Sequence, residues 1–394
     1  MDIGDSLDSQ SNKLRILGSN LSALIIYVLI NTLFVWKYST EYAGFSWMPV
    51  LYLVAIVFFL RLISRHYNLE SLRRESWGTI YAVAVLLIAI GLTFLMLRFD
   101  PQNINVGRYP ALHDWITRFL AGKFPYGSDV NPSGMPFLFM LAMPFYFLGD
   151  LGFFQICTFL IFAALVCRQS GRNLAACLRI IVLLVISPIF LFEIVVRSDL
   201  FSNMVIVLLY IYILERFSAG ERILNIILLG LIGGLILSTR GVVLMIYIIL
   251  LLYMIRQREM RYHIFLPSML VGFILTLLPF ALWNYDQFMQ SGPLAIQSSY
   301  IPGWAFILAI VASVVSGVAV RSFRGMYMAV YLTLFGIVLI AFARSVIQFG
   351  VVQSVLRDRF DISYFSFCLP FLLVSLMVAG NDSPVKNPAI EVST

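Results

Sequence analysis

The chain has 394 residues, of which 61% are hydrophobic and 12% charged, and its mean hydropathy is +0.92. These values lie outside the range of soluble domains, so they exclude a soluble globular protein and indicate an integral membrane protein. The net charge of +7 does not indicate a nucleic-acid partner, because Lys and Arg lie mainly in short loops, where they set membrane topology.

The polar N-terminal stretch MDIGDSLDSQSNKLR precedes an apolar run without a small-residue cleavage site, so we expect no cleaved signal peptide. Long apolar runs then recur along the chain, and their continuity predicts helices. The predicted fold is an all-α polytopic transmembrane bundle. About twelve spans are expected, at 16–36, 46–63, 77–97, 151–168, 176–196, 200–215, 222–239, 241–256, 263–283, 303–320, 326–347 and 363–380.

The spans divide the chain into three parts. Residues 1–76 form an N-terminal addition of two spans, residues 77–380 form the core, and residues 381–394 form a cytoplasmic tail. The four cysteines lie in or beside apolar runs without metal-ligand spacing, so we expect neither a disulfide framework nor a zinc site. The pattern requires no cofactor. Whether a divalent metal binds is left open, and no His/Asp cluster indicates a site for one.

A short apolar segment at 135–149 decides the topology. It contains Pro136 and Pro144 and is too short to cross comfortably. If it does not cross, the basic loops all face the side of Lys13 and Arg15, as the positive-inside rule requires of the cytoplasm. The expected location is the bacterial cytoplasmic membrane. Loops 98–134 and 284–302 then lie outside, and loops 61–76 and 256–262 lie inside.

The first outer loop, 98–150, predicts two interfacial helices. The segment RYPALHDWITRFLAG places Leu112, Trp115 and Ile116 on one apolar face, and Gly122 is placed to end the helix. We expect this helix to lie flat on the membrane. The turn-rich connector KFPYGSDVNPSG follows, and MPFLFMLAMPFYFLG forms the second interfacial helix.

Ionisable residues gather near the outer ends of several expected spans and in the last outer loop. They are Glu193, Arg197, Asp199, Arg240, Arg344, Arg357, Asp358, Arg359 and Asp361. Because a charge in hydrocarbon is costly unless it is paired or hydrated, their convergence indicates a functional site. The simpler alternatives are interfacial anchors that reach to headgroups and, for Arg197 and Asp199, a local ion pair at a helix start.

The order of these features resembles the GT-C superfamily of polytopic membrane glycosyltransferases, in particular its mannosyltransferase-like members. The resemblance rests on FLAGKFPY and NPSGMPFLFMLAMPF in the first outer loop, on the order of motifs between Arg197 and Arg261, and on DISYFSFCLPFLLVSL. It covers residues 77–380 and leaves the first two spans as an addition.

The resemblance implies transfer of a sugar, with inversion, from a polyprenyl-phosphate carrier to a glycan, lipid or protein acceptor at the outer face. A membrane donor also fits the lack of a Gly-rich phosphate loop, because nucleotide sugars are cytoplasmic. Family members carry the catalytic Asp roughly fourteen residues before the Gly that ends the surface helix. Here that position is Arg108.

Three acidic residues are therefore candidates for the general base: Asp114 first, because a helix holds it, then Asp100, and also Asp129. Arg240 and Arg344 are the expected partners of the donor phosphate. The expected substrate-binding residues are Arg108, His113, Tyr126, Arg197, Asp199, Arg359 and Asp361.

Each of these assignments has an alternative. His113 is more simply a solvated helix residue, and Tyr126 with Tyr109 and Trp115 an aromatic belt at the membrane interface. At the level of the whole chain, a transporter or flippase of a lipid-linked or anionic substrate is the second interpretation, and a glycan polymerase or ligase is the third. A transporter would carry its charges at mid-depth, whereas here they crowd the outer end.

Overall fold

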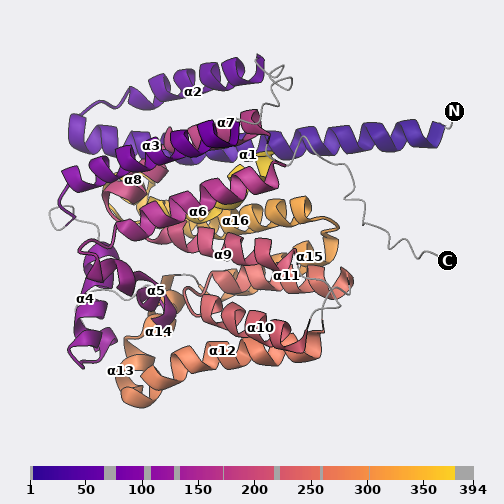
Figure 1. Cartoon of the computed structure of the whole chain (residues 1–394). Coiled ribbons are helices and arrows are strands. Elements are labelled where there is room, and N and C mark those ends of the chain that lie inside the picture. The colour runs from indigo at the N-terminus through magenta and orange to yellow at the C-terminus, as the bar shows by residue number, and fades with distance from the viewer. Residues whose placement is uncertain are drawn as a thin grey trace, which may run out of the picture.

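The computed structural model describes residues 3–65, 77–101, 108–127, 134–171, 173–216, 222–257, 261–300 and 302–377 (Figure 1). Within these ranges every regular element is a helix and no strand is found, so the predicted all-α class is confirmed. The expected cytoplasmic tail, most of loop 61–76 and Asp129 lie outside the described residues.

The helices follow one another with short connections. The first half of the chain forms α1 (Ile3–Ala43), α2 (Met48–Arg65), α3 (Trp77–Arg98), α4 (Arg108–Leu120), η2 (Pro125–Gly127), α5 (Pro136–Phe147), α6 (Phe153–Gln169), α7 (Leu174–Val185), α8 (Pro188–Val195) and α9 (Leu200–Leu214). The second half forms α10 (Ile223–Leu237), α11 (Val243–Gln257), α12 (Tyr262–Trp283), α13 (Tyr285–Gln290), α14 (Pro293–Tyr300), α15 (Gly303–Ala319), α16 (Phe323–Phe349), α17 (Val351–Leu356), η3 (Ile362–Cys368) and α18 (Leu369–Met377).

Four helices in the described ranges are long and apolar enough to cross a membrane by themselves. They are Asn20–Glu41, Gly78–Arg98, Tyr262–Trp283 and Phe323–Phe349. The bent pair of α7 and α8, which meet at 64°, adds a fifth span if the pair counts as one. The other apolar helices have 10–17 residues, fewer than the roughly 20 that a bilayer core requires, so the expected count of twelve spans is not confirmed.

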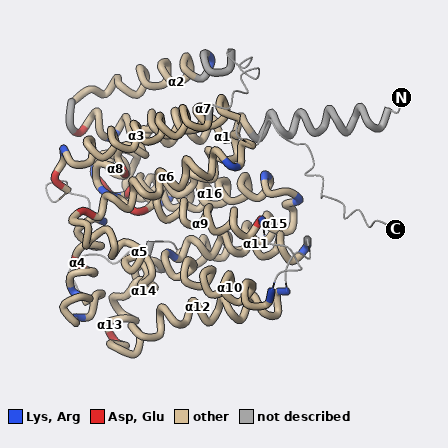
Figure 2. Tube along the Cα trace, in the orientation of Figure 1, with Lys and Arg blue, Asp and Glu red and all other residues tan. Residues whose placement is uncertain are grey.

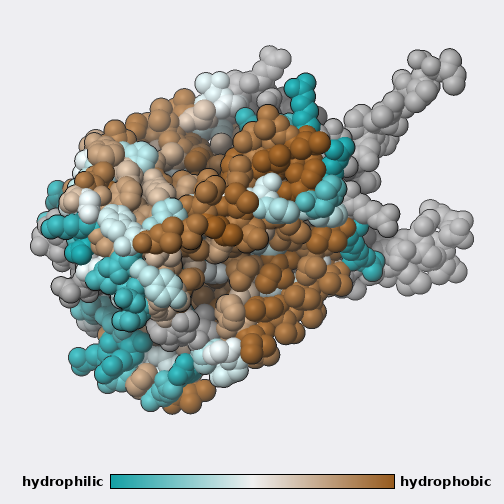
Figure 3. Space-filling view, turned by 90° about the horizontal axis from the view of Figure 1, so that it is seen from below, coloured by the Kyte–Doolittle hydropathy of each residue, from teal (hydrophilic) through white to brown (hydrophobic). Residues whose placement is uncertain are grey.

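The outer surface of the bundle is apolar along the long helices. On α12, for example, Leu270, Leu275 and Leu282 leave 57%, 60% and 77% of their surface exposed. The space-filling view shows a broad hydrophobic face, with hydrophilic residues toward its two ends (Figure 3). A continuous exposed apolar face of this kind is compatible with an integral membrane protein.

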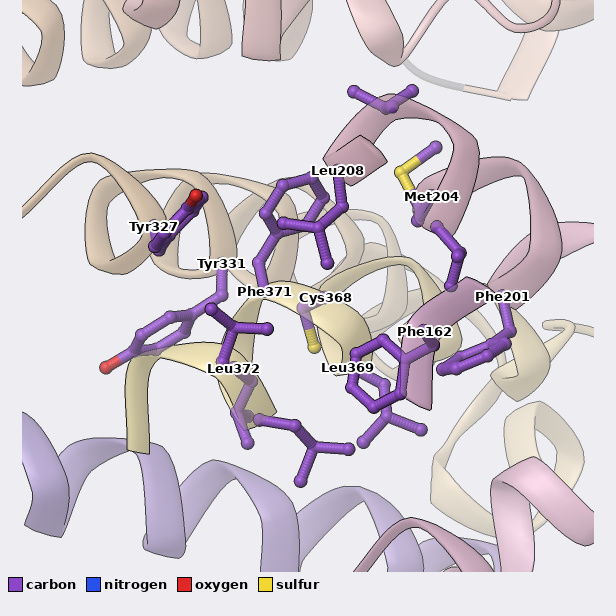
Figure 4. Packing of buried hydrophobic residues seen from close by; sticks show 14 of the residues in the cluster. Phe162, Phe201, Met204, Leu208, Tyr327, Tyr331, Cys368, Leu369, Phe371 and Leu372 are labelled. Carbon is purple, nitrogen blue, oxygen red and sulfur yellow. The ribbon is translucent and has the colours of Figure 1, made fainter. Parts of the chain in front are cut away.

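The main core lies where α6, α9, α16 and α18 meet. Phe162 of α6, Phe201 and Met204 of α9 and Leu369 and Phe371 of the last helix are all nearly inaccessible (Figure 4). In lipid, where the surroundings are themselves apolar, helices associate through close van der Waals packing rather than through escape from water. The tight contact of these side chains therefore provides much of the bundle's cohesion.

Glycines bring α10 and α12 into backbone contact. A Cβ added at Gly234 would lie 2.0 Å from the carbonyl oxygen of Met269, and one at Gly272 would lie 2.3 Å from that of Leu231. Spacings this short leave no room for a side chain, and small residues are what permit such approach in membrane bundles.

A second core joins the first outer loop to the bundle. The predicted surface helix is present as α4, and its apolar face, with Leu112, Trp115 and Ile116, is buried against residues of α5 and α12 such as Phe139 and Phe280. The residue that ends the turn after α4, Gly122, has a φ of +67°, as predicted for a helix stop. The expectation that α4 lies flat on lipid is wrong in this respect, because its apolar face packs on protein.

Charged side chains lie at the two ends of the helices, and most of the acidic ones gather at the end that carries α4 and α8 (Figure 2). The 12-residue helix α5 lies at this same end, between α4 and the last turn of α10, to which Met135 and Phe137 donate backbone hydrogen bonds. The end that carries α4, α5 and α8 is called the α4 end below.

Candidate functional site

The turn between α8 and α9 is the centre of a buried polar region at the α4 end. Glu193, Arg197, Ser198 and Asp199 each expose 3% of their surface or less. Glu193 accepts a hydrogen bond of 3.2 Å from the backbone N–H of Phe201 and so caps the first turn of α9. Three polar residues are thus buried in the connection between two apolar helices and a fourth, Glu193, in the last turn of α8, where each needs a partner.

Arg197 joins three segments. Its guanidinium forms an ion pair with Asp150, with 3.0 Å between Nη2 and Oδ2, and donates from Nη1 to the carbonyl oxygens of Phe99 at 2.8 Å and Val195 at 3.0 Å. The backbone of Arg197 has a φ of +50°, a left-handed conformation that costs a non-glycine residue energy. The side chain of Arg197 thus links the end of α3, next to Asp100, to Asp150, which precedes α6.

Arg240 and Asp199 form the most deeply buried ion pair among the described residues, with 4% of each side chain exposed. Arg240 follows α10 and donates from Nε to Asp199 Oδ2 at 3.0 Å. Its Cζ lies 5.8 Å from the ring centroid of Phe367. The expected local pair of Arg197 with Asp199 is therefore not formed, because each of these residues pairs with a partner from another segment.

Arg108, at the start of α4, reaches from the first outer loop to the last one. It donates to Ser363 Oγ at 2.6 Å and to Ser198 Oγ at 3.4 Å, pairs with Asp361, and places its Cζ 4.9 Å from the ring centroid of Tyr364. The position where the resemblance leads us to expect a catalytic Asp thus holds a buried cation that is paired with Asp361.

Asp361 also accepts a hydrogen bond of 3.0 Å from the backbone N–H of Ser363 and so caps η3. Burial alone would raise the pKa of Asp361, but the charge of Arg108 and the hydrogen bonds from Ser363 outweigh it and hold this pKa below its usual value. A second ion pair joins the same turn to α1, between Lys37 and Asp358.

The two expected phosphate partners differ in their surroundings. Arg344 is exposed on α16, and no ion pair or hydrogen bond of its side chain is found in the described part of the chain, whereas Arg240 is buried against Asp199. Arg359 is also exposed, with its Cζ 5.4 Å from the ring centroid of Phe349. Binding of phosphate by Arg240 would require Asp199 to give up its partner.

The candidate bases lie at the α4 end but in different surroundings. Asp100 is exposed. It follows Phe99, whose carbonyl oxygen accepts from Arg197, so it lies beside the Arg197–Asp150 pair. The pKa of Tyr109 is raised first by burial and then by the carboxylates of Asp150 and Asp100. Asp114 is half-buried on α4. Its neighbour His113 contacts Tyr146, at 5.0 Å between ring centroids, and Tyr109 at 5.9 Å.

Tyr126 does not face a polar site. It exposes 1% of its surface, its ring centroid lies 5.7 Å from that of Trp115, and its hydroxyl donates to the backbone oxygen of Gly134 at 3.4 Å. The burial of both Tyr126 and Trp115 also contradicts the alternative of an aromatic belt for these two residues. They belong to the second core.

Four residues of the polar region were not expected from the sequence: Lys37, Asp150, Ser198 and Ser363. Only Lys37 carried a signal, because a lone Lys near the end of an apolar run indicates a buried partner or a headgroup contact. The two serines and Asp150 lie in connections whose neighbours depend on the packing of distant helices.

Comparison with models of known protein families, with curated proteins and with solved structures found no match. The four cysteines are free. Among the described residues, no group of three or more His, Cys, Asp or Glu side chains is placed to hold a metal ion. The arrangement at the α4 end, rather than any relative, must therefore support a functional interpretation.

Proposed function

We propose that the chain is an integral membrane glycosyltransferase that moves a sugar from a polyprenyl-phosphate carrier to an acceptor at the outer face of the membrane. The observation that carries the proposal is the attachment of the first outer loop to the buried polar region. Arg108 ties α4 to the last outer turn, and Arg197 ties the end of α3 to α6. Asp114 thus stands on a helix at this end of the bundle, and Asp100 follows a helix end that Arg197 ties to the bundle.

The chemistry requires a base near cations. A hydroxyl acceptor must lose its proton as the sugar–phosphate bond breaks, and a carboxylate within hydrogen-bond reach accepts it. Asp114 and Asp100 are the two described candidates, and both are accessible to a substrate. The departing phosphate is stabilised by positive charge, for which the exposed Arg344 is better suited than Arg240, whose charge Asp199 already balances.

The proposed topology has about twelve crossings, with the α4 end outside and the membrane a bacterial cytoplasmic one. Three observations favour it. Helix α5 is short and packs between α4 and α10. The helices α7 and α8 together have the length of one span. The basic residues Arg222 and Arg256 lie at helix ends joined to the short connections that are expected inside.

The test is loss of turnover in two conservative variants. In full-length protein reconstituted in lipid nanodiscs, with a panel of polyprenyl-phosphate hexoses and a panel of hydroxyl acceptors, the release of polyprenyl phosphate is followed by mass spectrometry. We expect Asp114→Asn or Asp100→Asn to lower turnover by about 10² to 10⁴ because the proton acceptor is lost. Asp286→Asn, which removes an exposed acid on α13, serves as the matched control.

Wild-type rates in both variants would refute an acidic base in the described part of the first loop. A flippase predicts a different outcome for the wild-type protein itself. It would move the labelled lipid between leaflets of a vesicle without releasing any polyprenyl phosphate.

A further inference from the structure

The ion pairs at the α4 end fall into two kinds. In the pairs Arg197–Asp150 and Arg240–Asp199 both partners are shielded, since the carboxylates expose only 16% and 4% of their side chains. The pairs of Lys37 and Arg108 are asymmetric. These cations expose 5% and 6% of their side chains, whereas their partners Asp358 and Asp361 expose 66% and 47%.

This asymmetry decides which pairs can exchange a partner. If Asp150 or Asp199 left its arginine, a carboxylate would remain buried without a counter-charge, which is strongly unfavourable. Asp358 and Asp361 already face solvent, so water solvates them once they leave. A buried cation with an exposed counter-ion requires an anion but does not require that particular carboxylate.

Lys37 and Arg108 both bind the turn 357–361. They pair with Asp358 and Asp361, which lie three residues apart in this turn. The two cations come from distant segments, α1 and α4, and α1 packs directly against α17 and η3, which flank the turn that carries the two acids. Ser363 and Ser198 add hydroxyl groups within reach of Arg108.

We propose that Lys37 and Arg108 form a binding site for a phosphate-type anion, and that the turn 357–361 closes this site by placing Asp358 and Asp361 on the two cations. The carboxylates stand in for the oxygens of the ligand, and the ligand displaces them. The site does not depend on the glycosyl transfer proposed above.

The position of Lys37 favours a phosphate at headgroup level. Lys37 lies four residues before Glu41, the last residue of its candidate span, which at about 1.5 Å per residue is within roughly 6 Å of the end of that span. A phosphate monoester supplies several oxygens for a lysine and an arginine together, as charge-assisted hydrogen bonds require. The same chemistry is offered by a lipid headgroup and by free phosphate.

The turn has the features of a segment that can open. It follows Gly350, which has a φ of +82° between α16 and α17, and Asp358 itself has a φ of +54°, a conformation in which aspartate is tolerated better than most residues. Opening breaks the cap that Asp361 provides for η3, so the ligand must offset the hydrogen bonds that Asp361 accepts from the backbone N–H and the hydroxyl of Ser363, as well as two ion pairs whose carboxylates are exposed.

The test measures anion affinity of the full chain in a neutral detergent by native mass spectrometry. The probes are dioleoylphosphatidic acid and inorganic phosphate, and dioleoylglycerol is the lipid without phosphate. We expect the double variant Asp358→Asn/Asp361→Asn to bind phosphatidic acid about threefold to tenfold more tightly than wild type, because the competing carboxylates are gone. Lys37→Gln/Arg108→Gln should lose this binding. Asp286→Asn and Arg222→Gln, both exposed, are the matched controls.

Binding of phosphatidic acid but not phosphate assigns the site to a lipid headgroup, and binding of both assigns it to the phosphate group itself. A second measurement does not depend on the variants: hydrogen exchange of residues 351–361 in the wild-type chain should rise when phosphatidic acid is added. Unchanged or weaker binding in the double Asp variant, retained binding in the Lys37/Arg108 variant, or slower exchange of the turn with lipid would each overturn the proposal.

Discussion

The buried pair of Arg240 and Asp199 allows a sharp prediction of stability. Replacing Arg240 by Met removes hydrogen bonds from Nε and Nη2 to Asp199 Oδ2 and leaves a carboxylate that exposes 4% of its side chain without its main counter-charge. Breaking one partner of such a pair costs about 3–5 kcal/mol. Because Arg108 lies near enough to attract Asp199, we expect the lower end, about 3 kcal/mol.

The double variant Asp199→Asn/Arg240→Met removes both charges, and we expect it to recover most of the lost free energy of unfolding. The assay is unfolding by sodium dodecyl sulfate in mixed micelles, followed by circular dichroism. Asp286→Asn is the control, since this exposed acid on α13 should contribute at most about 1 kcal/mol. A single variant as stable as this control, or a double variant no better than the single one, would refute the reasoning.

Of three further predictions, two use the same unfolding assay and one uses the accessibility of introduced cysteines to a thiol reagent. Arg197→Gly should be more stable than Arg197→Ala by about 1 kcal/mol, because glycine adopts a φ of +50° without strain. Gly234→Ala should destabilise the bundle by forcing α10 from α12, whereas Gly91→Ala, whose Cβ meets nothing within 4 Å, should not; equal effects would contradict the packing argument. A cysteine in place of Lys123 should react with an impermeant thiol reagent in intact cells, and one in place of Arg222 only after permeabilisation; the reverse would invert the topology.

The apolar runs predicted several helices closely, because a membrane segment must satisfy its own backbone hydrogen bonds wherever it is apolar. The expected span 77–97 matches α3, and 263–283 matches α12. The expected span 176–196 is instead two helices that meet at 64° before Pro188, since proline disfavours a helical conformation for the preceding residue. Hydropathy is insensitive to such a break.

The gathering of charged residues was predicted, but their pairing was not. The sequence indicated that charges would meet at the α4 end, yet Arg197 pairs with Asp150 and Arg240 with Asp199. Joint binding of a phosphate by Arg240 and Arg344 stays a prediction, since Arg344 is exposed and Arg240 is paired with Asp199. Partners that lie far apart in the sequence are chosen by how the helices pack, and no periodicity of the chain records that choice.

Burial divides the α4 end into a fixed part and an exchangeable part. The fixed pairs join the end of α3, the start of α6 and the connections that flank α9 and α10, so they hold Asp100 in place whatever binds nearby. The exchangeable pairs join α1 and α4 to a single turn, 357–361. Any ligand-dependent rearrangement at this end should therefore be confined to that turn, since it is the element whose release leaves no carboxylate buried without a partner.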